Sequence, residues 1–354
     1  MTETASHGTN RIWKLLPGFA ISGYFLWRTI RSIRLTDLRN LHLQHPVWLA
    51  VLVIFLVLDY GLRGYRWWYM LRAYKARLSA CLRVLLTSLA ANNILPFRVG
   101  DFMRIFAYAG DVRAPSSTVL STVILERLLD IFMLFAFLVV GLLGVDQRFA
   151  PVSVHGHSVG VLHLAGLILV LASLGLGLLL FGTGLLHRFT ERLVARFGQH
   201  PRTKKLGEWA VLLFDAVLHL SFLGRVWLVV LTGVIWACES MIFVSCARMI
   251  GLVSGARGPW LAASLSNLSF LLPSAPGGIG PFEASAKLAM RAQGVADGEA
   301  GVYALLVHVI ILFAITAAGG LVFLVHRAKR GSMTKPLAQD LAALPTDYEV
   351  PETH

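Results

Sequence analysis

The sequence predicts an all-α polytopic membrane protein with about six full spans and two re-entrant helical hairpins arranged as inverted repeats. Composition supports this class, because the mean hydropathy is +0.68, 56% of the residues are hydrophobic and only 14% are charged. Long apolar runs alternate with short polar segments, as in a chain of membrane-spanning helices. Two further apolar segments are interrupted by proline and glycine, and these interruptions predict the hairpins.

The positive charge of the chain indicates lipid partners. The formal net charge is +13, but Lys and Arg lie in loops between apolar runs, as they do in cytoplasmic flanks. We therefore expect membrane lipids, and no nucleic acid, as partners. Cys81, Cys238 and Cys246 show neither metal-site nor disulfide spacing, so we expect packing residues, no metal ion and no cofactor.

The apolar runs also predict the membrane topology. Full spans are predicted at residues 15–29, 47–62, 119–145, 159–186, 226–250 and 302–325. Interfacial helices are expected between the first two spans and at 208–223. The loop at 146–158 is poor in Lys and Arg, whereas the loop at 188–205 is strongly basic. The positive-inside rule then predicts a multi-pass protein of the bacterial inner membrane with a cytoplasmic C-terminus.

One transmembrane domain is expected at 1–330, followed by a polar, mobile cytoplasmic tail at 331–354. The segment RGYRWWYML at the end of the second span is interpreted as an aromatic belt with a basic cluster at the cytoplasmic interface.

The first interrupted segment, residues 82–108, contains NNILPFRVGDFMR. It is too short on either side of Pro96 to cross the membrane twice, so a re-entrant hairpin is expected. Arg98 and Arg104 flank the break, and the planar guanidinium fork suits a phosphate, although snorkelling to the interface is an alternative. Asn92 and Asn93 are expected to satisfy loosened backbone rather than to bind substrate.

The second interrupted segment, residues 267–289, is the main candidate site. Its helix-breaking residues are Pro273, Pro276, Gly277, Gly278 and Gly280. Pro281 then suits the first position of a new helix that Gly280 caps, and the free N–H groups of such a half-helix suit an anionic headgroup. Glu283 and Lys287 lie in its first turns and are either ligand contacts or partners of each other. The alternative for the whole segment is a simple proline kink.

The two interrupted segments also form an internal repeat, with halves at about 47–145 and 226–326. A single offset pairs ionisable residues of the two halves: Arg66 with Arg248, Asp101 with Glu283, and Glu126 with His308. If one hairpin enters from each side, the repeats are inverted, and a site at their interface supports alternating access.

Ionisable residues inside spans are costly, so they should face the protein interior or a cavity and have partners. Those expected to gate a cleft or to carry protons are Glu126, Arg127, Asp130, Glu239 and His308. The i,i+3 spacing of Arg127 and Asp130 predicts a local ion pair. The alternative is that the cluster around Glu126 anchors its helix at headgroup level.

Four motifs, RGYRWWYML, NNILPFRVGDFMR, ERLLD and LLPSAPGGIGPFEA, occur in this order and resemble those of the lysylphosphatidylglycerol synthase/flippase-type transmembrane family. The resemblance covers nearly the whole chain and is most specific around PGGIGPFE. It implies a bacterial inner-membrane domain that moves lipids between leaflets, fused in some relatives to a lipid aminoacyltransferase. Because this chain lacks that fusion, we expect a transporter and not an enzyme. Asp101 departs from the Glu expected at that family position.

Together these observations predict a lipid flippase-like transporter for a lipid with a polar, anionic headgroup. The expected substrate-binding residues are Arg98, Asp101, Arg104, Gly277, Gly278, Gly280, Glu283 and Lys287. The main alternative is an accessory subunit of a lipid or glycan pathway, such as hopanoid or glycolipid synthesis, that binds a lipid-synthesising enzyme. An intramembrane enzyme and an ion-coupled exporter of small solutes are further alternatives, and a homo-oligomer is compatible with each.

Overall fold

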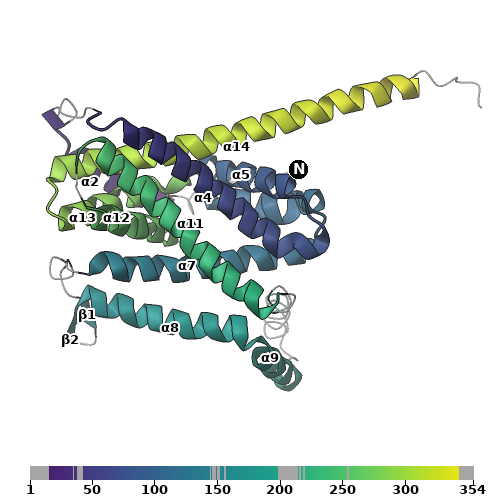
Figure 1. The fold of residues 1–354 in the computed structure, drawn as a ribbon, viewed down its shortest axis with the longest axis horizontal. Helices are drawn as coiled ribbons and strands as arrows, with labels where there is room; N and C mark the ends of the chain where they lie inside the picture. The colour runs from purple at the N-terminus through teal and green to yellow at the C-terminus, as the bar shows by residue number, and fades with distance from the viewer. Residues whose placement is uncertain are drawn as a thin grey trace, which may run out of the picture.

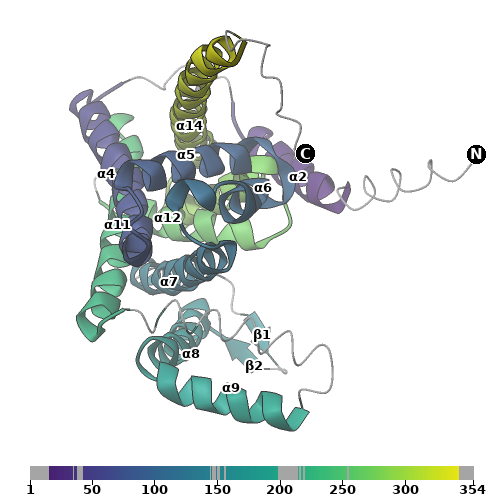
Figure 2. The ribbon, with the colours of Figure 1, turned by 90° about the vertical axis from the view of Figure 1, so that its right-hand side faces the viewer.

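The computed structural model describes residues 16–342, except for residues 35, 38–42, 144, 146–148, 150, 151, 155, 156, 198–213, 215, 216, 218, 219, 253 and 254. Helices make up nearly all of the described chain (Figure 1). The strands in these ranges are β1 (Val152–Val154) and β2 (His157–Val159), a short antiparallel pair (Figure 2). The predicted helical class is therefore confirmed apart from one small hairpin.

The helices, in chain order, are α2 (Leu16–Ile30), α4 (Val47–Leu71), α5 (Leu78–Ile94), α6 (Val99–Phe102), α7 (Ser116–Leu142), α8 (Val161–Phe181), α9 (Thr183–Phe197), α11 (Phe222–Met249), α12 (Arg257–Leu268), α13 (Pro281–Ala292) and α14 (Asp297–Ala342). Short helical turns are η1 (Arg72–Tyr74), η2 (Pro96–Arg98), the π-helical η3 (Met103–Ala107), η4 (Gly110–Val112), η6 (Ser269–Leu271) and η7 (Pro276–Gly278).

Four described helices are long and apolar enough to cross a membrane: Val47–Tyr74, Val161–Phe181, Phe222–Met249 and Asp297–Ala328. These correspond to four of the predicted spans. The helix at the first predicted span, α2, has only 15 residues. The helix at the third, α7, is long but carries Glu126, Arg127 and Asp130 in its middle.

Three predicted boundaries differ from the structure. The helix α4 continues past residue 62 to Leu71 because Arg63 and Arg66 have carboxylate partners inside the protein. The span predicted to reach residue 186 ends at Phe181, and the amphipathic α9 takes up the start of the predicted basic loop. At the C-terminal end, α14 runs on to Ala342 and projects from the body, so the predicted tail begins as helix (Figure 1). Most of the second predicted interfacial helix (208–223), and residues 35 and 38–42 of the first, lie outside the described residues.

The predicted aromatic belt at the end of α4 is wrong for two of its residues. Arg66 and Trp67 are buried rather than interfacial. The Trp67 indole N–H donates to the Thr122 hydroxyl in α7 at 3.1 Å. Because a buried indole needs such a partner, this end of α4 packs against α7 rather than facing headgroups.

Helices of each predicted half pack against helices of the other half. The helices α4 and α11 run side by side in both ribbon views (Figures 1 and 2). Of the first half, α5 packs against α14 of the second, and α12 of the second half packs against α7 of the first. Such reciprocal packing is what two related repeats produce, while the inverted orientation of the repeats stays a prediction.

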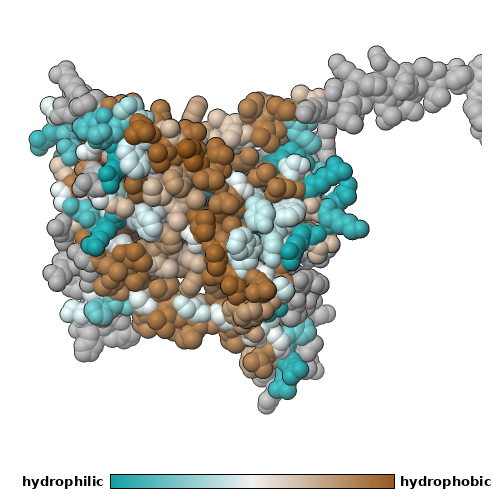
Figure 3. All heavy atoms as spheres, in the orientation of Figure 1, coloured by the Kyte–Doolittle hydropathy of each residue, from teal (hydrophilic) through white to brown (hydrophobic). Residues whose placement is uncertain are grey.

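The surface is consistent with a membrane environment. Hydrophobic side chains cover the middle of the face shown in Figure 3, and hydrophilic side chains gather at its left and right edges. Large apolar side chains such as Val57 and Phe313 are exposed. The largest buried cluster includes Phe243, Phe282 and Tyr303, whose hydroxyl donates to the Phe243 carbonyl at 3.0 Å. This core holds α11, α13 and α14 together.

Candidate functional site

Both predicted breaks are present. After α5, Leu95 has extended backbone geometry (φ −100°, ψ 141°) and Pro96 opens η2. Between α12 and α13 the chain is extended at Leu272 (φ −80°, ψ 142°) and again at Ala275 (φ −60°, ψ 163°). A simple proline kink would keep one continuous helix, so that alternative is wrong for the second break.

The start of α13 is as predicted, with Pro281 at its first position and Gly280 as its cap. Gly280 has φ 100°, a conformation that residues with a Cβ rarely adopt. A Cβ at this position would also overlap the backbone of Ser22 in α2. Glycine is therefore needed here both for its backbone angle and for the close approach of α2.

The two breaks meet in space. The position of a Cβ on Gly277 lies 3.5 Å from the Asn93 carbonyl oxygen, so the loop of the second break touches the end of α5. The Arg98 guanidinium lies over the Phe270 ring, 6.0 Å from its centre. From the other side, the Ser22 hydroxyl of α2 accepts a hydrogen bond from the Ala275 N–H at 2.7 Å. The loop from Ala275 to Gly280 is thus flanked by α5 on one side and by α2 on the other.

Glu283 occupies the N-terminus of α13. Its Oε2 accepts a hydrogen bond from the Gly280 N–H at 2.6 Å, and its Oε1 lies 2.8 Å from Nδ1 of His308. Nε2 of His308 lies 3.0 Å from the Gly277 carbonyl oxygen, which can only accept, so Nε2 carries a proton. The contact between Glu283 and Nδ1 therefore holds one further proton, on either the carboxyl group or the ring.

At the half-helix, one of the N–H groups that were expected to be free is occupied. The Gly280 N–H donates to the Glu283 carboxylate, and the Ser22 backbone lies against Gly280. Lys287 does not pair with Glu283. Its ammonium donates to the Ser32 hydroxyl at 2.6 Å and forms an ion pair with Asp297 at 2.9 Å.

Beside the breaks, nine ionisable side chains from α4, α6, η3, α7 and α11 form three neighbouring groups of ion pairs, called here together the interior charge network. Its members are Asp59, Arg63, Arg66, Asp101, Arg104, Glu126, Arg127, Asp130 and Glu239. Four arginines face five carboxylates, so the cluster is close to neutral when all groups are ionised.

Arg66 holds the centre of the network. Its Nη1 donates to Asp130 at 2.7 Å and to the Thr232 hydroxyl at 3.0 Å, and its Nε lies 3.9 Å from Glu126. The Trp236 indole also donates to Asp130, at 3.2 Å. One arginine thus ties α4 to α7 and α11, and all of these groups are buried.

Arg104 completes the pairing of Glu126. Its Nη2 lies 2.7 Å from the Glu126 carboxylate, and its guanidinium lies over the Trp67 ring at 3.8 Å. Both charged groups are buried, so Arg104 neither snorkels nor reaches a ligand in this conformation. Glu126 faces the protein interior, as predicted for an ionisable residue in a span.

A second arginine bridges α4 to α11. Arg63 donates to Asp59 at 2.8 Å and to Glu239 at 3.4 Å. Its guanidinium lies 5.0 Å from the centre of the Trp236 ring, which connects this group to Asp130. The predicted interior carboxylate Glu239 therefore has an arginine partner on the facing helix.

The outermost pair of the network is Asp101 with Arg127. Their carboxylate and guanidinium lie 3.0 Å apart, and their side chains are 14% and 38% exposed. Asn92 fixes the acid, because its amide donates to Asp101 at 3.1 Å and its amide oxygen accepts from the Asp101 N–H at 3.3 Å. The predicted local pair of Arg127 with Asp130 is replaced by these longer-range pairs.

Arg98 stands apart from the network. It is exposed, it has φ 52° at the start of α6, and among the described residues no carboxylate lies within ion-pair distance of it. A non-glycine residue with positive φ costs free energy and is held by its surroundings.

Sequence reasoning found most of the interior acids and two of the arginines, Arg104 and Arg127, but not which acid each arginine pairs with. Asp59, Arg63 and Arg66 were not identified as site residues. Their spacing places them on one face of a helix, which is the signal that could have found them. Among the described residues, no group of three or more His, Cys, Asp or Glu side chains is arranged to hold a metal ion.

The sequence model of one family, the lysylphosphatidylglycerol synthase TM region, matches residues 15–319. Neither the curated proteins nor the solved structures give a match. The matched region runs from α2 into α14 and includes both breaks and the whole interior charge network.

Proposed function

Because this chain belongs to the lysylphosphatidylglycerol synthase transmembrane-region family, we propose that it is a lipid flippase-like transporter. It moves a lipid with an anionic headgroup between the leaflets of the bacterial inner membrane. The two halves act as inverted repeats, the two breaks act as re-entrant hairpins, and the C-terminus is cytoplasmic. The headgroup passes where the breaks meet, while the acyl chains stay in lipid.

The placement of Arg98 is the observation that supports this proposal most strongly. Arg98 is an exposed guanidinium at the meeting point of the two breaks, without a carboxylate partner among the described residues. A guanidinium binds a phosphate with charge-assisted, bidentate hydrogen bonds. Its positive φ sets the backbone turn from which α6 starts. Arg98 is therefore the first contact of the headgroup.

Arg127 is the second contact in this mechanism. It is 38% exposed and pairs with Asp101 next to Arg98. A phosphate that reaches Arg98 competes with the Asp101 carboxylate for Arg127. When the phosphate takes this place, α6 is released from α7, and this release opens the first hairpin. When the phosphate leaves, Asp101 pairs with Arg127 again.

The other predicted contacts hold the protein together in this conformation. They serve as network partners, turn residues or helix caps rather than as ligands: Arg104, Gly277, Gly278, Gly280, Glu283 and Lys287. Of the residues expected to gate or to carry protons, Glu126, Asp130 and Glu239 form the buried frame of the charge network. The pair of Glu283 with His308 is suited to proton coupling, because it holds one proton between two groups.

A transport assay with matched arginine variants tests the proposal. Wild type, Arg98→Gln and Arg113→Gln are placed in liposomes with headgroup-labelled anionic or zwitterionic lipids, and the initial rate of label accessibility is measured. Arg113 is the matched control, because it is also an exposed arginine with positive φ (58°). We expect Arg98→Gln to lower the rate for anionic lipid at least about tenfold, since one charge-assisted contact is lost.

Equal rates in Arg98→Gln and Arg113→Gln would remove Arg98 from the mechanism. If folded wild-type protein moves none of the lipids, the transporter proposal fails. The role to test next is then that of an accessory subunit, by co-purification with a lipid-synthesising enzyme.

A further inference from the structure

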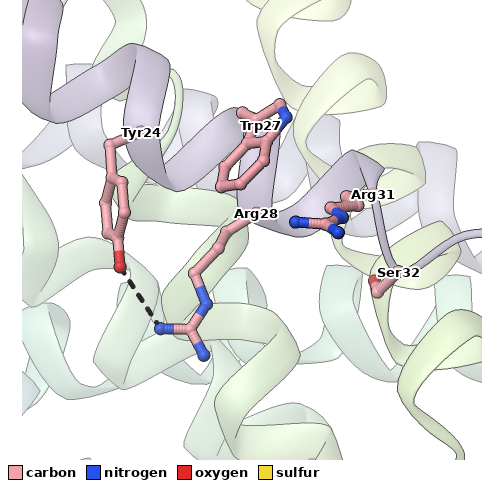
Figure 4. A pocket seen from close by; sticks show the side chains of 5 residues that line it. All are labelled: Tyr24, Trp27, Arg28, Arg31 and Ser32. Atoms are coloured by element: carbon pink, nitrogen blue, oxygen red, sulfur yellow. Dashed lines mark hydrogen bonds between the residues drawn. The ribbon is translucent and has the colours of Figure 1, made fainter.

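A shallow pocket lies at the C-terminal end of α2, away from the residues of the charge network. It is lined by Tyr24, Trp27, Arg28, Arg31 and Ser32 (Figure 4). The first four residues follow the spacing i, i+3, i+4 and i+7, which places their side chains on one face of a helix. Helical geometry continues past the end of α2, because the Arg31 N–H donates to the Trp27 carbonyl at 2.9 Å.

The opposite face of α2 is fixed to the protein. Ser22 and Thr29 are buried there, and the Ser22 hydroxyl accepts a hydrogen bond from the backbone of the second break. The pocket therefore lies on a helix whose position is set by packing rather than on a free segment. A site of this kind exists before a ligand binds.

Two cations in this pocket have no carboxylate partner among the described residues. Arg28 donates to the Tyr24 hydroxyl at 3.4 Å, and the Arg31 guanidinium lies over the Trp27 ring at 5.2 Å (Figure 4). Both arginines are exposed. Aromatic groups position the two guanidinium groups but leave their positive charge uncompensated, so the pocket favours an anion.

The neighbouring cations contrast with this pair. Lys287 donates to the Ser32 hydroxyl at the edge of the pocket, but it also forms an ion pair with Asp297 at 2.9 Å. Arg291 pairs with the same carboxylate at 2.9 Å. Asp297, the carboxylate near the pocket, thus pairs with Lys287 and Arg291 and not with Arg28 or Arg31.

The exposed apolar groups of α2 indicate the source of the anion. The Trp27 side chain is 54% exposed, and Phe19 and Ile30 on the same helix are about as exposed. Trp and Tyr next to basic residues are typical of the headgroup level of a bilayer, with apolar groups facing the chains. A phospholipid satisfies both parts of this surface, whereas a free phosphate satisfies only the arginines.

We propose that the pocket at the end of α2 binds an anionic phospholipid. Arg28 and Arg31 hold the phosphate, the Tyr24 hydroxyl donates a hydrogen bond to it, and the Trp27 ring packs against the glycerol and the upper acyl chain. Since α2 also covers the second break through Ser22, bound lipid stabilises that break. The site does not depend on lipid movement by the protein.

Lipid binding to the purified full chain tests this proposal. Thermal unfolding is followed in zwitterionic detergent as phosphatidylglycerol, phosphatidylcholine or soluble glycerol phosphate is added. The pocket variant is Arg28→Gln/Arg31→Gln. The control is Arg34→Gln/Arg113→Gln, which removes the same charge from two exposed positions outside the pocket.

We expect phosphatidylglycerol to raise the unfolding temperature of wild type and control, with an apparent affinity at least about tenfold weaker in the pocket variant. Phosphatidylcholine and glycerol phosphate should have little effect. Three results would each overturn the proposal: the same loss in the control variant, which would indicate unspecific charge; an equal effect of glycerol phosphate, which would indicate a free anion; and no effect of the pocket substitutions.

Discussion

The carboxylate of Asp101 in α6 lies 3.0 Å from the guanidinium of Arg127 in α7 and joins the first short half-helix to the long helix that follows it. In the second half, Glu283 joins α13 to α14 in the same way through His308, at 2.8 Å. The two joints differ in their access to water, because the Asp101 side chain is 14% exposed and that of Glu283 only 4%. Under the proposed mechanism, this difference makes the first break, rather than the second, the one that moves.

Local backbone geometry of the first hairpin agrees with this assignment. It contains the π-helical turn η3 and the positive φ of Arg98. Both features are frequent at functional sites, where strain is held by the surrounding structure.

Removal of the outer ion pair should change stability little. We expect Asp101→Asn and Arg127→Gln each to alter the free energy of unfolding by less than about 1 kcal/mol, because a partly exposed pair gains little net energy. A double-mutant cycle by thermal unfolding measures their coupling. The same variants should change transport strongly, since Arg127 is then either permanently free or absent. Large destabilisation with unchanged transport would identify the pair as structural only.

Removal of the central arginine, Arg66, should instead lower the stability of the protein strongly. Arg66→Met leaves the buried Asp130 carboxylate without its main partner, and we expect a loss of about 3–5 kcal/mol in the free energy of unfolding. Arg66→Met/Asp130→Leu should be less destabilised than Arg66→Met alone, because no unpaired charge remains. Thermal unfolding of both variants against Arg113→Gln measures this, and a double variant worse than the single would contradict the assigned pairing.

Two substitutions of Glu283 distinguish the role of the Glu283–His308 pair in folding from its role in proton coupling. In Glu283→Gln the amide oxygen can still accept from the Gly280 N–H, and the amide NH₂ can donate to Nδ1 of His308, so the fold should be kept. The exchangeable proton of the pair is lost, and we expect transport to fall and to lose its dependence on a proton gradient. Glu283→Ala should instead destabilise the protein by about 1 kcal/mol or more through the lost cap.

Measurement of transport with and without an imposed pH gradient, for wild type and Glu283→Gln, decides this point. Equal transport by the two proteins under both conditions would exclude the pair from coupling.

The close approach of α2 to the second break predicts opposite effects at two glycines. Gly280→Ala places a Cβ at φ 100° and against the Ser22 backbone, so we expect a loss of more than about 1–2 kcal/mol. Gly23→Ala is the control, because no atom lies within 4 Å of its added Cβ. It should stabilise α2 by about 0.5–1 kcal/mol. Thermal unfolding measures both, and a neutral Gly280→Ala would mean that α2 does not cover the break.

Features fixed by local chemistry could be predicted from the sequence. Pro281 and Gly280 set the start of α13 through their own backbone preferences, and both breaks follow from proline and glycine. The burial of Glu126 and Glu239 follows from the cost of charge in a membrane interior.

Features that depend on distant partners could not be predicted in this way. From the sequence alone, Arg66 resembles an interfacial arginine, because its partner Asp130 lies on another helix. Arg104 likewise finds Glu126 only in the folded chain. The bond from the Gly280 N–H to Glu283 is an exception, because a Glu three residues after the N-cap is the acidic half of a capping box and is visible in the sequence.

The central claim, that the protein moves anionic lipid across the bilayer, is tested most directly with the unmodified chain. Wild-type protein is placed in sealed liposomes with headgroup-labelled anionic, zwitterionic or polyprenyl-phosphate lipid, and a membrane-impermeant quencher is added outside. The account predicts that quenching of an anionic label continues beyond the outer-leaflet fraction, while protein-free liposomes stop there. Quenching that stops at the outer-leaflet fraction for every lipid, with folded protein in the membrane, would contradict it.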